Sequence, residues 1–304
     1  MKLLNITPRL FLAFALSGWL VSQLAFADTY PSLFDSRDPV LQRNLENVIE
    51  SIGLGPAVKK KQLSLDLVDI TDLRHPRVAS INGDNMVYAA SLPKIAILLS
   101  AFVEIERGKM QLDSDTRNTL TDMIRYSSNQ AATRMYHRVG QERIAEILQS
   151  DRYHLYDRDV NGGLWVGKEY GKGKAWRRDP LHNLSHGATA MQTARFYYML
   201  ETGQLVSEPL AREMKEILSK PAINHKFVKG LKQSHPGAKI YRKSGSWRHW
   251  HADSAIVESA GHKFIVVALA DNPKGGQWLQ KLITPLYELI VPDVVAVNQH
   301  TALH

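Results

Sequence analysis

The sequence contains no cysteine, and this absence excludes disulfide bonds and thiol catalysis. The stability of the folded chain must therefore come from its core. The sequence also lacks internal repeats, low-complexity segments and any stretch that resembles a long linker. Its 304 residues are 44% hydrophobic and 22% charged, which is enough for one large globular domain or for two interleaved lobes. We therefore expect a single domain.

A run of apolar residues long enough to span a membrane is also lacking. Two basic residues precede the apolar residues 10–21, and A-F-A at 25–27 supplies the small-x-small cleavage pattern of a secretory signal peptide. Because the apolar run is short for a membrane span, cleavage before Asp28 is favoured over an uncleaved anchor. We expect residues 1–27 to be a signal peptide. Residues 28–304 would form one catalytic domain that is periplasmic or secreted, without stable insertion into a membrane.

The chain has no excess of acidic residues, since its formal net charge is +8. Removal of residues 1–27 takes away two basic and no acidic residues, so the charge falls to +6. A basic surface suits an anionic substrate or the anionic polymers of a cell wall. Nucleic acid is not an expected partner, because the basic residues are dispersed and the chain is expected to be exported.

What the sequence does contain is three short polar motifs in one order. They are S-L-P-K at 91–94, S-S-N at 127–129 and K-S-G at 243–245. A serine hydroxyl is a poor nucleophile at neutral pH and needs an adjacent base. Lys94 can supply this base if it follows Ser91 by one helical turn. The motifs therefore indicate an acyl-transfer site.

The residues around Ser91 indicate the start of a helix. The apolar residues 95–103 are typical of a buried helix, and Pro93 is tolerated in a first turn, where backbone N–H groups lack intrahelical partners. Ser91 would then lie at a helix N-terminus, whose dipole favours negative charge. Burial would lower the pKa of Lys94, so that a neutral amine could accept the serine proton.

Each motif alone is a weak signal, because S-x-x-K is expected about once by chance in a chain of this length. A further S-x-N at 80–82 lies before the candidate nucleophile, in the wrong order. The alternative interpretation is a capping serine, a surface turn and a strand-end lysine. The ordered combination favours the acyl-transfer site over that alternative.

In this combination the chain resembles the penicillin-recognising serine hydrolases, and the class A β-lactamase branch in particular. The resemblance runs from about residue 40 to the C-terminus. It includes the nucleophile segment at 87–94 and the second-motif segment at 123–132. It also includes A-T-A-M at 188–191, which resembles the start of the helix after the omega loop of that family.

The order of the elements predicts an α+β fold. The strand-like segments are 63–67, 86–88, 239–243, 254–258 and 264–270, and the helical segments include 142–149, 189–200, 209–218 and 277–290. Strands at both ends with helices between them predict an antiparallel sheet closed by the two termini, plus an inserted helical lobe.

The resemblance implies a β-lactamase/transpeptidase-like fold, in which helices flank a five-stranded antiparallel sheet and an all-α lobe lies beside it. The sheet lobe would then take about residues 40–90 and 235–295, and the helical lobe about 91–234. The three motifs would lie in the cleft between the lobes.

The resemblance also implies catalytic roles. Ser91 would attack the amide carbonyl, Lys94 would activate Ser91, and Ser127 would pass a proton to the leaving nitrogen. The backbone N–H groups of Ser91 and Ser246 would form the oxyanion hole.

Substrate binding would fall to the other motif residues. Asn129 would hydrogen-bond the side-chain amide of the substrate and help to hold Lys94. Lys243 and Ser244 would bind the substrate carboxylate, and Gly245 would let the substrate lie close to the strand edge. Arg248 is either a second positive charge at that subsite or an exposed surface arginine.

The sequence departs from the family at the deacylation step. Class A enzymes use a glutamate in an E-x-x-L-N motif to activate the hydrolytic water, and no such motif lies between Ser127 and Lys243. Glu169 is one candidate for this base, although a solvated loop residue is the preferred interpretation. Asp179 is another, although a structural ion pair with an arginine is more plausible. Ser128 replaces the aspartate that is usual in the second motif.

A metal site is not expected, and neither is a cofactor. His249 and His251 share one face if they lie on a strand, but two ligands without a third make a weak zinc site. We expect these histidines to pack beside the neighbouring tryptophans at the edge of the cleft.

Three functions stay open on the sequence alone. The first is a class A-like serine β-lactamase that opens β-lactam amides through an acyl-Ser91 intermediate. The second is a D,D-peptidase, amidase or esterase of the same superfamily, with a substrate such as an acyl-D-Ala peptide. The third is a penicillin-binding receptor that deacylates slowly.

Overall fold

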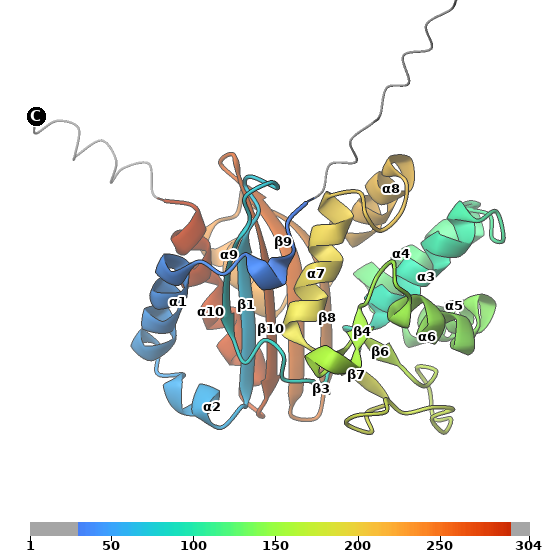
Figure 1. The fold of residues 1–304 in the computed structure, drawn as a ribbon, viewed down its shortest axis with the longest axis horizontal. Coiled ribbons are helices and arrows are strands. Elements are labelled where there is room, and N and C mark those ends of the chain that lie inside the picture. Colours follow the sequence, from blue (N-terminus) through green and yellow to red (C-terminus); the bar gives the residue numbers. More distant parts are fainter. Residues whose placement is uncertain (1–29, 293–304) are drawn as a thin grey trace, which may run out of the picture.

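The computed structural model describes residues 30–292, which form a sheet lobe and a mainly helical lobe side by side (Figure 1). The signal peptide expected at residues 1–27 lies outside the described residues. Within the described range, no helix is both long enough and apolar enough to cross a membrane.

The sheet has five antiparallel strands in the order β2-β1-β10-β9-β8. Their bounds are β1 Leu63–Asp69, β2 Arg77–Ile81, β8 Lys239–Trp247, β9 Trp250–Ser259 and β10 His262–Asp271. Strands from the two ends of the chain meet where β1 pairs with β10. Strand β8 forms one edge of the sheet, on the side of the helical lobe (Figure 1).

Helices cover both faces of the sheet because successive side chains of a strand point to opposite faces. Leu65 and Leu67 of β1 belong to one apolar cluster with three helices, whereas Val68 belongs to a second cluster with α7. The helices of the first cluster are α1 Pro39–Ser51, α9 Lys226–Ser234 and α10 Gly275–Ile290, and α7 spans Ala190–Glu201. A short helix, α2, covers Gly55–Lys59.

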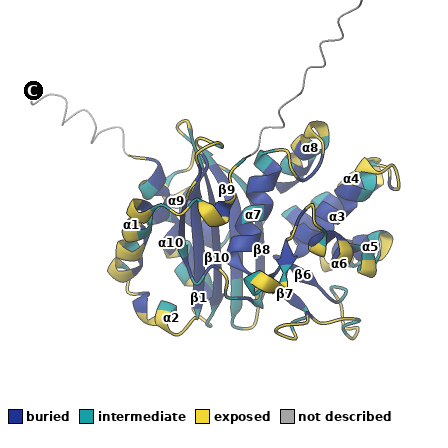
Figure 2. Cartoon of the chain, in the orientation of Figure 1, coloured by how far each residue is buried: buried dark blue, intermediate teal, exposed yellow. Residues whose placement is uncertain are grey.

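The helical lobe is built around α3, which is buried from its first residue, Lys94, to Val103 (Figure 2). A helix that is apolar on all sides is stable only inside a protein, and the other helices of the lobe surround it. They are α4 Ser114–Arg125, α5 Asn129–Val139, α6 Gln141–Gln149 and α8 Glu208–Leu218.

Short strands connect the lobes. Strands β3 Val87–Tyr88, β7 His186–Ala188 and β6 Trp165–Val166 form a three-stranded sheet, and β4 Tyr156–Asp157 pairs with β5 Gly162–Gly163. Strand β3 leads into the nucleophile segment. Strands β6 and β7 enclose residues 167–185, which we call the cleft loop.

The predicted α+β class and the five-stranded antiparallel sheet are confirmed. Two local predictions differ from the structure. Helix α3 begins at Lys94, so Pro93 is its N-cap rather than a residue of its first turn, and Ser91 lies in the turn directly before the helix. Helices α7 and α9 fall in the range expected for the helical lobe, yet both pack in the clusters that cover the sheet, because their apolar faces match its two surfaces.

Candidate active site

The candidate nucleophile, Ser91, lies in the turn between β3 and α3. The preceding residue, Ala90, has a φ of 51°, in the left-handed region that residues other than glycine rarely adopt. Such strain persists only where the surrounding structure imposes it, and it gathers at functional sites. The tight turn places Ser91 at the edge of the sheet, next to β8.

Lys94 is fully buried, and its Nζ lies among groups of the second motif. It donates to the Ser127 carbonyl oxygen at 2.6 Å and to Asn129 Oδ1 at 2.8 Å, and it lies 3.4 Å from Ser127 Oγ. Burial lowers the pKa of Lys94 to about 7. Asn129 therefore holds Lys94 as expected, whereas no hydrogen bond joins the Ser91 hydroxyl to Lys94 in the described part of the chain.

The second motif is held at the start of α5 by a side-chain cap. Ser128 Oγ accepts a hydrogen bond from the Ala131 N–H at 3.1 Å, which satisfies one of the unpaired donors at the helix N-terminus. Ser127 has a φ of 56°, so its backbone is also in the left-handed region. The serine that replaces the usual aspartate thus acts as the N-cap and fixes the residues on either side of it.

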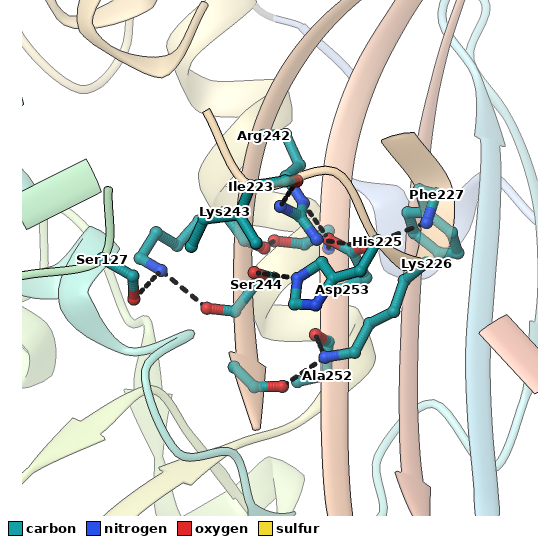
Figure 3. Close-up of polar contacts among 12 residues, drawn as sticks. Ser127, Ile223, His225, Lys226, Phe227, Arg242, Lys243, Ser244, Ala252 and Asp253 are labelled. Atoms are coloured by element: carbon teal, nitrogen blue, oxygen red, sulfur yellow. Dashed lines mark hydrogen bonds and ion pairs between the residues drawn. The ribbon is translucent and has the colours of Figure 1, made fainter. Parts of the chain in front are cut away.

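The third motif meets the second through Lys243. Its side chain is 1% exposed, and Nζ donates to Ser127 Oγ at 3.0 Å and to the Ser244 carbonyl oxygen at 2.6 Å (Figure 3). Burial, and then the nearby charge of Lys94, hold the pKa of Lys243 well below its usual range. Ser127 Oγ thus lies between two buried amines, and all three motifs form one site.

Gly245 is packed against the nucleophile turn. A Cβ atom at this position would lie 2.1 Å from the Ala89 carbonyl oxygen and 2.8 Å from the Ser91 backbone nitrogen. Any side chain would therefore collide with backbone, which cannot move aside. The expected reason for this glycine was an approach of substrate to the strand; the contact in this structure is with the nucleophile's own backbone. It brings the N–H groups of Ser91 and Ser246 close together.

A layer of buried charge lies under the third motif (Figure 3). Arg242 pairs with Asp253 through Nε at 2.6 Å and Nη2 at 2.8 Å, and both side chains are buried. Asp253 Oδ2 also accepts from the Phe227 N–H at 3.1 Å, which ties α9 to the sheet. Lys226, at the start of α9, is buried as well. This region therefore holds more buried cations than buried carboxylates.

His225 contacts the third motif from the same side. Its Nε2 lies 3.2 Å from Ser244 Oγ (Figure 3). Burial, followed by the charges of Arg242 and Lys226, lowers the pKa of His225 to about 4, so its ring is neutral at neutral pH. Sequence reasoning missed His225 and Lys226, because neither belongs to a motif and only the contacts of the start of α9 with β8 and β9 bring them to the site.

The cleft loop presents Tyr170, and not Glu169, to Lys94. Glu169 Oε2 pairs with His137 Nε2 at 2.9 Å. The Tyr170 ring centroid lies 4.6 Å from Lys94 Nζ, and its hydroxyl donates to the Ala90 carbonyl oxygen at 3.3 Å. The ring centroid also lies 4.3 Å from that of His186, with the two rings tilted by 38°. The two neighbouring loop residues therefore point to different places, and the aromatic one lies beside the amine.

Asp179 is a structural residue of the cleft loop. Its buried carboxylate accepts hydrogen bonds from the Tyr156 hydroxyl at 3.2 Å and from the backbone N–H groups of Leu181, His182 and Leu184. Among the described residues it has no ion pair with an arginine, in contrast to the expected loop-closing pair. Backbone N–H groups hold the carboxylate instead, because the loop turns back over it.

The other candidates at the cleft edge are occupied by local contacts. Arg248 is exposed, and its guanidinium lies over the Trp247 ring at 5.8 Å. The His249 ring lies 3.8 Å from the Trp250 ring at a tilt of 39°, and its Nε2 lies 3.2 Å from Asp271 Oδ1. Within residues 30–292, no group of three or more histidine, aspartate or glutamate side chains is placed to hold a metal ion.

Together these residues can transfer protons over short distances. A neutral Lys94 amine can take a proton from a serine hydroxyl, and Ser127 Oγ can relay a proton between the two buried amines and a substrate atom. The N–H groups beside Gly245 can stabilise an oxyanion. This combination of groups is suited to acyl transfer.

Comparisons with known proteins agree with this arrangement. The family described as the beta-lactamase enzyme family matches residues 58–117 and 114–290. Among solved structures, PBP-A has a TM-score of 0.63 and 16% identity, over 86% of this chain and 98% of that chain. A β-lactamase from Sphaerobacter thermophilus has a TM-score of 0.63 and 14% identity, over 81% of this chain and 95% of that chain.

A β-lactamase from Chitinophaga pinensis has a TM-score of 0.63 and 13% identity, over 81% of this chain and 97% of that chain. At such identities the structural likeness establishes the fold alone. No curated protein matches the chain by sequence. The family match spans more than half of the chain and contains all three motifs, and the chain therefore belongs to the beta-lactamase enzyme family.

Proposed function

We propose that the protein is a serine acyl hydrolase that opens β-lactam amides through an acyl-Ser91 intermediate. The observation that carries this proposal is the contact of the three motifs: Ser127 Oγ lies 3.4 Å from Lys94 Nζ and 3.0 Å from Lys243 Nζ, and both amines are buried. A purely structural role would not require two buried amines around one hydroxyl, because burying an amine without a carboxylate to balance its charge is unfavourable.

Acylation would proceed as follows. Ser91 Oγ forms a bond to the amide carbonyl carbon while its proton moves to the neutral Lys94 amine. The N–H groups of Ser91 and Ser246 stabilise the oxyanion. The carbon–nitrogen bond then breaks, and Ser127 donates its proton to the leaving nitrogen and regains one from Lys94. The products are an ester at Ser91 and a free amine, so no other reactant is needed.

The substrate would be anionic. The Lys243 ammonium and the Ser244 hydroxyl would bind its carboxylate, while Asn129 would bind its side-chain amide. A point variant of PBP-A, which is 15% identical to this chain with a TM-score of 0.62, forms an acyl-enzyme complex with penicillin G. This related fold can therefore hold the kind of adduct that we propose.

Deacylation is the step at which a second candidate function gains support. Glu169 is bonded to His137, Asp179 is bonded within its own loop, and Tyr170 lies beside Lys94. Neither of these two carboxylates is thus placed to activate a water at the ester. We propose that the ester is hydrolysed slowly, as expected for a D,D-peptidase-like enzyme or a penicillin-binding receptor rather than for an efficient β-lactamase.

Peptide mapping of the protein after incubation with benzylpenicillin tests the proposal. We expect one penicilloyl group, located on Ser91, and no adduct on the Ser91→Ala variant. Substitution of Ser100, a buried α3 serine whose hydroxyl bonds the Ala96 carbonyl oxygen, is the matched control, and the adduct should form on Ser100→Ala. An adduct at another residue, or none, would contradict the proposal.

We also propose that the chain is exported and cleaved before Asp28. The support is the pattern of basic residues, apolar run and A-F-A site at residues 1–27. Sequencing the N-terminus of the protein recovered from a periplasmic fraction tests this. A mature chain that begins at Met1 in the membrane fraction would instead indicate an anchor.

A further inference from the structure

Lys226 is a buried lysine to which the acylation scheme gives no role. Its side chain is 3% exposed, and its Nζ donates to the Gly245 carbonyl oxygen at 2.5 Å, to Ser246 Oγ at 2.8 Å and to the Ala252 carbonyl oxygen at 3.0 Å (Figure 3). All three ammonium hydrogens are therefore used by neutral groups. An ammonium that donates to a carbonyl makes a charge-assisted hydrogen bond, and a buried site strengthens it.

The contact with Gly245 matters because of what lies on the other side of the same peptide group. The Gly245 carbonyl and the Ser246 N–H belong to one trans peptide, so they point in opposite directions. The carbonyl points toward Lys226 and toward Ala252, its register partner on β9. The Ser246 N–H therefore points to the free edge of β8, where the Ser91 backbone lies against Gly245.

We propose that Lys226 is a positioning residue for the oxyanion hole: its ammonium polarises the Gly245–Ser246 peptide and makes the Ser246 N–H a stronger donor to the substrate oxyanion. The proposal rests on the proposed acyl-Ser91 chemistry. Hydrogen bonds in a chain polarise one another, so charge withdrawn from the carbonyl oxygen increases the positive charge on the amide hydrogen. A fixed charge of this kind acts where negative charge develops in the transition state.

The local structure holds Lys226 in place at a cost. Its φ is 49°, in the left-handed region, although it is the first residue of α9. Its burial also lowers its pKa to about 8, mainly through desolvation. Asp253, the nearby buried carboxylate, is already paired with Arg242. A residue that only started a helix would need neither the strain nor the burial, so both point to a role for the amine.

Direct binding of a substrate carboxylate by Lys226 is the competing role. The amine faces the carbonyl side of the peptide and has no free hydrogen. Lys243 and Ser244 are the residues of the third motif proposed for the carboxylate. Lys226 would therefore act through the peptide, whether or not the substrate has a carboxylate.

The infrared carbonyl stretch of the acyl-enzyme tests this role, because its frequency falls as the oxyanion hole polarises the ester. We would use ¹³C-labelled benzylpenicillin with the wild type and with Lys226→Met, Lys226→Gln and Lys229→Met. Lys229 is an exposed lysine of the same helix, so its variant is the matched control for charge. For Lys226→Met we expect a band at higher frequency and acylation slower by about tenfold, less than the 10²–10³-fold cost of removing an oxyanion donor.

The remaining outcomes separate the explanations. Lys229→Met should match the wild type in both band and acylation rate. With Lys226→Met, the rate of acylation by penicillin methyl ester should fall by the same factor as the rate with the free acid. If Lys226→Met does not fold, Lys226→Gln, which keeps a donor without the charge, should still show a raised band. An unmoved band in a folded Lys226 variant, or a loss confined to the free acid, would overturn the inference. Absence of any wild-type adduct would instead overturn the proposed function on which it rests.

Discussion

The two sides of the candidate active site differ in how many of the groups proposed for catalysis they contribute. On the β8 side, Lys243 bonds Ser127, Lys226 bonds the Gly245 carbonyl, and Gly245 fits against the nucleophile turn with no room for a side chain. On the cleft-loop side, the carboxylates are bonded elsewhere and an aromatic ring lies beside Lys94. The residues proposed for acylation therefore lie together, whereas neither Glu169 nor Asp179 is placed as a base for hydrolysis.

This difference teaches that acylation and deacylation are separable properties of the fold. Under the proposed function, acylation depends on the buried amines of α3 and β8 and on the backbone donors beside Gly245. Deacylation would depend on side chains of one loop of 19 residues, 167–185. The predictions below break one side or the other.

The largest effect should come from removing the base. Lys94→Met keeps the buried volume but removes the amine that accepts the Ser91 proton, and it leaves Asn129 Oδ1 without its donor. We expect acylation by benzylpenicillin to slow by about 10³-fold. Stopped-flow or quenched mass measurements would report this rate. Lys109→Met, at an exposed lysine just after α3, is the control and should leave the acylation rate unchanged. A rate that falls by less than about tenfold in Lys94→Met would exclude Lys94 as the base.

The next largest effect should come from adding a methyl group where Gly245 of β8 contacts the turn at Ser91. Gly245→Ala places a Cβ against the Ala89 carbonyl oxygen and the Ser91 nitrogen, so backbone must shift. We expect an acylation rate lower by about 10²-fold and a free energy of unfolding lower by about 1–3 kcal/mol. Denaturant titration and acylation kinetics check both.

Gly237→Ala is the control for this variant, because its Cβ would meet no atom within 4 Å. It should behave like the wild type. Normal acylation by Gly245→Ala would mean that the contact of β8 with the nucleophile turn does not position the oxyanion hole.

A change on the cleft-loop side should alter only the second step. Tyr170→Glu places a carboxylate where the ring now lies beside Lys94, and we expect the ester to be hydrolysed about 10²-fold faster. Tyr170→Gln adds no base and should stay within about tenfold of the wild type. The lifetime of the adduct is the measurement.

Glu169→Gln provides the complementary comparison, because Glu169 is bonded to His137. The adduct of this variant should have the lifetime of the wild type. A lifetime that grows severalfold would show that Glu169 reaches the ester after all and that the cleft loop rearranges on acylation.

The smallest effect should be that of pH on the wild type. Burial lowers the pKa of Lys94 to about 7, so the amine is protonated below pH 7 and neutral above it. Only the neutral amine accepts the Ser91 proton, so the acylation rate should rise about tenfold from pH 5.5 to 6.5 and level off above pH 8. A rate that is flat over this range would contradict a lysine base with that pKa.

The sequence predicted those elements that have a local pattern of apolar residues. The alternation at Leu63, Leu65 and Leu67 predicted β1, and the apolar run after Lys94 predicted the buried α3. The motif residues could be singled out because each motif is a recognisable short sequence and the three motifs follow one another in a fixed order along the chain. The contact of Lys94 with Asn129 was expected from the family resemblance, whereas the contact of Ser127 with Lys243 was not predicted.

The rest depends on pairing between distant segments, which no local pattern records. Lys226 and His225 reach the site only because the start of α9 docks against β8 and β9, and Tyr170 reaches it only because the cleft loop folds back to Ala90 and Lys94. The preference for Glu169 as a solvated residue agrees with its partly exposed ion pair with His137, but nothing in the sequence indicated that its neighbour would lie beside Lys94.

The most direct test of the account is the lifetime of the adduct on the wild-type protein, followed by intact mass after brief exposure to benzylpenicillin and removal of the excess. We predict that the penicilloyl mass forms and then persists for minutes or longer, because the residues proposed for acylation lie together and neither Glu169 nor Asp179 is placed as a base for deacylation. Clearance within seconds would contradict the account and identify an efficient β-lactamase.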